Sequence, residues 1–84
     1  MPQGKPGGRQ TAEEREFNRA LAVRMAVARD LAGVRQETMA RALGVNRTHI
    51  SNIEAGKIRL SVYQAVRWAE VVRIPLNRLI ERKP

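Results

Sequence analysis

Residues 33–57, GVRQETMARALGVNRTHISNIEAGK, contain two short helical patterns separated by a glycine. We expect one helix over about 36–43 and a second over about 47–55, because aliphatic and small side chains recur at helical spacing in both. Gly44 permits a positive φ in the turn between them, and Asn46 is a suitable N-cap for the second helix. The stretch therefore predicts two helices packed across a tight turn.

The second of these helices carries an unusual set of polar side chains. Its apolar residues before the C-terminal end are Ile50 and Ile53, which mark the buried side. A solvated face is more often filled with Glu and Lys, which form helix well. The polar side chains here are of medium length and suit contact with a partner: Arg47, Thr48, His49, Ser51 and Asn52.

Length and composition exclude several classes of protein. The 84 residues suffice for one small domain, and the absence of cysteine excludes disulfides, thiolate metal sites and cysteine nucleophiles. His49 is the single histidine, so we expect neither a zinc site nor a catalytic triad. No apolar run approaches the ~20 residues of a membrane span, and the N-terminus has no signal-peptide core, which predicts a cytoplasmic protein.

The charge points to a polyanionic partner. Sixteen Lys and Arg residues against eight Asp and Glu give a net charge of +8. Such a balance favours nucleic acid first and an anionic membrane second. A basic surface that merely aids solubility is the alternative, which charge alone does not exclude.

The N-terminal part divides into an arm and a helix. Residues 1–10, rich in Gly and Pro, predict a disordered basic arm that either tracks DNA or is an inert leader, and 11–84 form the domain. Thr11 and Glu14 form a capping box, so a helix is expected over about 12–32. Its expected core face lies at helical spacing: Phe17, Leu21, Met25, Ala28 and Ala32.

Two more helices complete an all-α, five-helix expectation. A fourth helix begins behind Ser61 and ends before Pro75, and a short fifth helix covers about 76–82. Nothing alternates with period two, so no sheet is expected. The core candidates of these segments are Val62, Val66, Trp68 and Ala69, then Leu76, Leu79 and Ile80.

The central stretch resembles the helix-turn-helix of the phage repressor and Cro superfamily, the Xre-type transcriptional regulators. The elements that carry the resemblance are Gly33-Val34, Gln36-Glu37, Met39-Ala40, Leu43-Gly44-Val45 and Ile53-Glu54-Ala55-Gly56. It extends over about residues 20–82 and implies a lambda-repressor-like DNA-binding domain. Arg35 replaces the usual Ser or Thr cap, Arg73 replaces a glycine that commonly ends the fourth helix, and the first helix begins about two turns early.

The resemblance implies roles for named residues, with the second helix of the motif in the major groove. Arg47, Thr48 and Asn52 would face base edges, where Arg47 suits guanine, Asn52 suits adenine and the Thr48 methyl suits thymine. The candidates for phosphate contact are Gln36 first, then Asn46, His49, Ser51, Lys57 and Arg59. A merely solvated polar face is the alternative.

Glu54 would repel DNA if it faced outward. The resemblance implies that Arg29 of the first helix pairs with it, as a partly buried structural ion pair. A weak surface pair is the alternative.

Two apolar surfaces are candidates for a dimer or partner contact. One is the stripe Val23, Val27 and Leu31, which lies off the core face of the first helix; the other is the C-terminal set Leu76, Leu79 and Ile80. A two-fold dimer would place two recognition helices ~34 Å apart on a near-palindrome. Burial of the stripe on one wide helix face is the alternative.

These observations predict a homodimeric regulator that binds a double-stranded DNA operator and blocks transcription, including that of its own gene; a compact activator is also open. We expect a bacterial or phage-encoded, nucleoid-associated protein, with no enzymatic activity, cofactor, metal, small-molecule ligand or membrane. Any protein partner would be a toxin, an anti-repressor or RNA polymerase. The alternatives are an antitoxin that also represses its operon, and a protein-interaction module that has lost DNA binding.

Overall fold

The computed structural model describes residues 10–81, and every regular element among them is a helix. The elements in chain order are α1 (Ala12–Leu31), α2 (Gln36–Leu43), α3 (Arg47–Glu54), α4 (Val62–Val72) and α5 (Leu76–Leu79). The all-α, five-helix prediction is confirmed over this range. No helix there is long and apolar enough to cross a membrane. The predicted basic arm, residues 1–10, lies outside the described residues except for Gln10.

The helix ends follow from local side-chain chemistry. The Thr11 hydroxyl accepts from the Glu14 N–H at 3.0 Å, and the Glu14 carboxylate accepts from the Thr11 N–H at 3.0 Å. Ser61 and Gln64 form the same reciprocal cap at the start of α4. These side chains bond backbone N–H groups that no helical carbonyl can reach, so α1 and α4 begin where the sequence predicts.

Two chain reversals need a left-handed backbone. Gly44 has φ 75° between α2 and α3, which glycine adopts without steric penalty. Arg73 has φ 62° at the end of α4 and is the only non-glycine residue with positive φ in the described chain. Its backbone therefore stands in a conformation that a Cβ disfavours.

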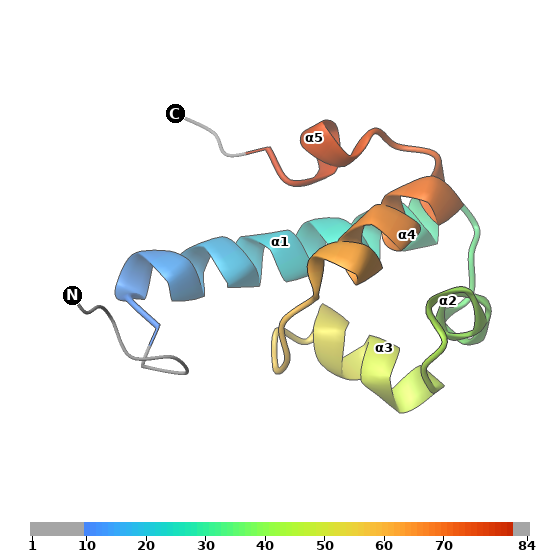
Figure 1. Cartoon of the computed structure of the whole chain (residues 1–84), viewed down its shortest axis with the longest axis horizontal. Coiled ribbons are helices and arrows are strands. Elements are labelled where there is room, and N and C mark those ends of the chain that lie inside the picture. The colour runs from blue at the N-terminus through green and yellow to red at the C-terminus, as the bar shows by residue number, and fades with distance from the viewer. Residues whose placement is uncertain (1–9, 82–84) are drawn as a thin grey trace.

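Helix α1 runs across the middle of the molecule, as Figure 1 shows, with α5 on one side of it and α2 and α3 on the other. Helices α2 and α3 pack against each other, α3 also packs on α1, and α4 packs on α2. The N-terminal half of α1 projects beyond the other helices (Figure 1). The arrangement leaves one side of α3 open.

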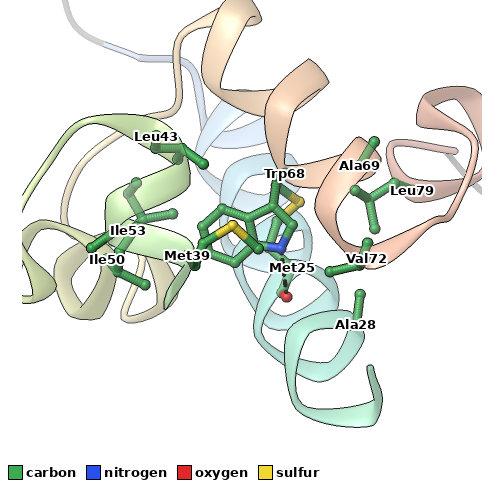
Figure 2. Close-up of a cluster of buried hydrophobic side chains, with 11 residues drawn as sticks. Met25, Ala28, Met39, Leu43, Ile50, Ile53, Trp68, Ala69, Val72 and Leu79 are labelled. Atoms are coloured by element: carbon green, nitrogen blue, oxygen red, sulfur yellow. Dashed lines mark hydrogen bonds between the residues drawn. The ribbon is translucent and has the colours of Figure 1, made fainter. Parts of the chain in front are cut away.

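Trp68 of α4 lies at the centre of the core. Its side chain is fully buried, and its indole N–H donates to the Met25 carbonyl of α1 at 3.0 Å (Figure 2). Met39, Ile50 and Ile53 pack around it from α2 and α3. One aromatic ring thus joins α1, α2, α3 and α4 in a single apolar cluster, with its polar N–H satisfied.

Several sequence-based expectations about burial are wrong. Val62 is 80% exposed because it is the first residue of α4, where no other helix covers it. Phe17 and Ala32 lie near the two ends of α1, where no other helix covers them fully; Phe17 is half-buried and Ala32 exposed. The fifth helix is one turn, shorter than the predicted 76–82, with Ile80 as its C-cap.

Candidate nucleic-acid interface

Helix α3 presents a polar edge opposite its buried side. Ile50 and Ile53 are at most 2% exposed, and they fix the rotation of α3 against the core. Arg47 and Thr48 consequently lie in solvent at the first turn, and Asn52 is half-buried one turn later. Neither Thr48 nor Asn52 has a side-chain hydrogen bond among the described residues, so both have free donors and acceptors.

Arg47 is held by a chain of hydrogen bonds that begins on α1. Its guanidinium donates to the Gln36 Oε1 at 3.1 Å, and the Gln36 Nε2 donates to the Glu54 Oε1 at 2.9 Å. The Glu54 carboxylate in turn accepts two hydrogen bonds from Arg29. The side chains of Arg29 and Glu54 are only 15% and 9% exposed. A buried ion pair therefore anchors an exposed arginine through one intervening amide.

Arg29 anchors this series of hydrogen bonds. Its guanidinium also donates to the Val34 carbonyl at 2.7 Å, between α1 and α2. The hydrogen bond to the Glu54 carboxylate raises the pKa of Arg29 above its ordinary value, against the opposing effect of burial. Glu54 faces inward and is paired, so its charge is neutralised at the edge of α3.

Both the oxygen and the nitrogen of the Gln36 side-chain amide form hydrogen bonds within the protein. The sequence predicts that it binds a phosphate; the structure places it between Glu54 and Arg47 at the N-terminus of α2. Its backbone N–H, at the first position of α2, still belongs to a helix end that can bind an anion. The assignment of Gln36 to phosphate stays a prediction.

The other predicted phosphate contacts divide into two groups. Asn46 caps α3, with its side-chain oxygen 2.8 Å from the His49 backbone nitrogen, and it is exposed. His49 and Ser51 are half-buried within α3. Lys57 and Arg59 follow α3 and are exposed, on the rim of a cavity that also includes Arg15 and Arg19 of α1.

Sequence reasoning missed Arg15 and Arg19 as part of this basic surface. Their four-residue spacing places both on one face of α1, and this is a signal that the sequence does contain. What the sequence does not give is that this face meets the loop after α3.

The candidate partner surface on α1 lines a groove, to which only Leu79 of the C-terminal set contributes. Val23, Val27 and Leu31 are 57%, 50% and 82% exposed, so the stripe is not buried within the monomer. They line a groove of about 450 Å³ together with Ile74 and Leu79 from the α4–α5 end of the chain.

The C-terminal set, Leu76, Leu79 and Ile80, is only partly exposed. Leu79 is 4% exposed and belongs to the core, because the single turn of α5 directs it toward α1 and α4; that part of the prediction is wrong. Leu76 is half-buried against the core, and Ile80 is 36% exposed. The Arg24 guanidinium donates to the Leu79 carbonyl at 3.3 Å and holds α5 on α1. The groove lies on the α5 side of α1, away from α3 (Figure 1).

Within residues 10–81, no group of His, Asp and Glu side chains is arranged to hold a metal ion. The polar edge of α3 carries hydrogen-bonding side chains and the Arg47 cation, and the Glu54 carboxylate at its end is paired with Arg29. Such an edge suits the outer edges of bases and the phosphates beside them.

Comparison with known proteins agrees with this geometry. The sequence profile of the helix-turn-helix family matches residues 25–79. No curated protein sequence matches the chain. Among solved structures, the restriction-modification controller protein C.AhdI from Aeromonas hydrophila is similar, with a TM-score of 0.70 and 23% identity over 77% of this chain and 94% of that one. The hypothetical transcription factor NHTF from Neisseria has a TM-score of 0.67 and 25% identity, over 95% of this chain and 85% of that one.

Proposed function

Because this chain belongs to the Xre/Cro-like helix-turn-helix family of DNA-binding transcription regulators, we propose that it is a homodimeric repressor that reads a near-palindromic operator. Helix α3 enters the major groove, and the N-terminus of α2 crosses the phosphate backbone. Arg47, Thr48 and Asn52 read base edges. Repression follows from occupancy, because a bound dimer over a promoter excludes polymerase.

The observation that carries the proposal is the orientation of Arg47. Its guanidinium is exposed yet held by Gln36, which is held in turn by the Arg29–Glu54 ion pair. An arginine fixed before binding loses less side-chain entropy when it forms two hydrogen bonds to guanine. An arginine that is only solvated would not require these hydrogen bonds to hold its orientation. The arrangement therefore favours base reading over a solvated face.

The groove between α1 and α5 supports a dimer. Exposed valine and leucine side chains along α1 are costly in water, and a second copy of this chain is the occupant that we propose. Since the groove lies on the side of α1 away from α3, dimerisation there leaves both recognition helices free.

The test is selection of binding sequences from random double-stranded DNA, near physiological salt and with excess nonspecific competitor. The wild-type protein is expected to select a near-palindromic motif. Arg47→Ala is expected to lose the preference at one base position of each half-site, because its contact discriminates by ~1–3 kcal/mol. Arg73→Ala is the matched control: it removes an exposed arginine at the end of α4, which lies outside α3 and does not line the α1–α5 groove, and it is expected to select the unchanged motif.

Selection of no motif by the wild-type protein would refute the proposed base reading. The same groove favours one second candidate, an antitoxin whose toxin occupies the α1–α5 surface. A monomer that binds an operator only together with a second, neighbouring gene product would indicate that function, whereas an operator-bound homodimer supports the repressor.

A further inference from the structure

A second basic surface lies beside α3 and belongs to no predicted contact as a whole. It is a cavity of about 500 Å³ between the N-terminal half of α1 and the loop 55–61 that joins α3 to α4. The loop approaches α1 closely, since a Cβ added at Gly56 would lie 4.0 Å from the Cβ of Ala22. A hollow of this size is within the range of small-ligand sites.

The lining of the cavity has one sign of charge. Arg15 and Arg19 line it from α1, and Lys57 and Arg59 line it from the loop, with no carboxylate among the lining residues. Within residues 10–81, Arg19, Lys57 and Arg59 have no side-chain hydrogen bond or ion pair. Arg15 donates to the Gln10 carbonyl at 2.9 Å and keeps its charge uncompensated. Four like charges around one hollow repel each other unless an anion joins them.

Apolar side chains also line the cavity, namely Leu21, Ile53, Ile58 and Leu60. Apolar neighbours lower the local dielectric and strengthen the attraction of the cations for an anion. The wall on α1 precedes residue 25, where the family match begins, so the cavity depends on a segment outside the matched part of the chain.

We propose that this cavity binds a phosphate group, with Arg19, Lys57 and Arg59 as its direct ligands and Arg15 beside them. Arginine forks match phosphate oxygens, and Lys57 adds a point charge. The first nine residues carry Lys5 and Arg9 and no acidic residue, so the N-terminal segment of this chain is not a suitable occupant. The phosphate belongs either to the DNA backbone beside the base-reading site or to a free phosphorylated molecule; only the first source rests on the proposed function.

The first arm of the experiment uses free phosphates on the whole chain. Inorganic pyrophosphate and ATP are titrated into the protein by calorimetry at low salt, for the wild type, Arg19→Gln and Arg73→Gln. Arg73 is the matched control because its replacement also removes one exposed positive charge, but it lies at the end of α4 and lines neither the cavity nor the α1–α5 groove. If the source is a free phosphate, Arg19→Gln is expected to bind about tenfold more weakly, the effect of removing one charge-assisted hydrogen bond, and Arg73→Gln is expected to bind as the wild type does.

The second arm uses DNA of unrelated sequence, so that it does not depend on base reading. The slope of log affinity against log salt falls by about 0.9 for each DNA phosphate that the protein no longer neutralises. If the source is the DNA backbone, Arg19→Gln is expected to flatten the slope by about this amount, and Arg73→Gln is expected to flatten it less.

Weaker binding confined to Arg19→Gln in either arm supports the proposal and identifies the source. Equal effects of Arg19→Gln and Arg73→Gln in both arms overturn the proposal, because the general charge of the protein then explains them. The absence of any effect overturns it as well. Failure of the operator proposal is recognised separately, since it removes the selected motif without changing the result with pyrophosphate. Circular dichroism checks that each variant is folded, which we expect because Arg19 is exposed.

Discussion

At the scale of the residue, the Arg29–Glu54 pair has the largest consequence for stability. Arg29→Ala leaves the Glu54 carboxylate buried and without its two guanidinium hydrogen bonds. We expect the free energy of unfolding to fall by about 3 kcal/mol, measured by urea denaturation. Glu70→Ala is the control, since its ion pair with Arg67 lies on the surface and its removal should hardly move the midpoint. Equal midpoints for the two variants would contradict a structural role for the buried pair.

The contacts of this pair could be predicted from the sequence only in part. The need for Glu54 to be neutralised follows from its place on α3, the helix that we propose faces DNA, and the choice of Arg29 follows from the family resemblance. The amide of Gln36 between Glu54 and Arg47 does not follow from either. It depends on how α2 crosses α3, which only the three-dimensional packing determines.

At the scale of the element, the backbone at the end of α4 is strained, and a substitution can relieve that strain. Arg73 has φ 62° and ψ 41°, where an L side chain meets its own backbone. Arg73→Gly should therefore raise the stability by about 0.5 to 1 kcal/mol, since the relief of strain exceeds the added chain entropy of glycine. Thermal unfolding measures this as a higher Tm. The opposite substitution, Gly44→Ala, supplies the control and should lower the Tm, because Gly44 has φ 75°. A lower Tm for Arg73→Gly would mean that the arginine side chain stabilises the fold.

The starts of α1, α3 and α4 were predictable from the sequence because their caps are local, whereas the end of α5 was not. Thr11, Asn46 and Ser61 each bond an N–H three residues away, so their effect needs no tertiary information. Burial was less predictable because it depends on the neighbouring helix. Val62 has helical spacing to Val66 and Ala69, yet it lies in the first turn of α4 and is not covered by another helix.

At the scale of the whole molecule, the α1–α5 groove should set the oligomeric state. Val27→Asp places a charge among the valine and leucine side chains of the groove, which Arg24, Arg78 and Glu81 also line. Because Val27 is 50% exposed, the monomer fold should survive. We expect a shift from dimer to monomer in light scattering coupled to size exclusion, with operator affinity lower by about 10²-fold or more, since avidity disappears. Val62→Asp is the matched control on α4, at 80% exposure. A dimer that persists in Val27→Asp would place the interface elsewhere.

The core should unfold as one unit. Trp68 is the single tryptophan and contacts α1 through its N–H while it lies among side chains of α2 and α3. Its fluorescence should shift to longer wavelength on unfolding at the same denaturant concentration at which the helical circular dichroism disappears. Two separate transitions would indicate that α1 or α5 detaches before the rest.

The hydrogen-bond chain from Arg29 to Arg47 also constrains how such a protein can evolve. Thr48 and Asn52 have no side-chain partner in the described chain, so a single mutation at either can alter operator preference without disturbing another residue. Arg47 is different, because its replacement leaves the Gln36 oxygen without its donor, and a change at Gln36 reaches Glu54. Lineages that diverge from this sequence should therefore exchange Thr48 and Asn52 singly and early, and exchange Arg47 and Gln36 together.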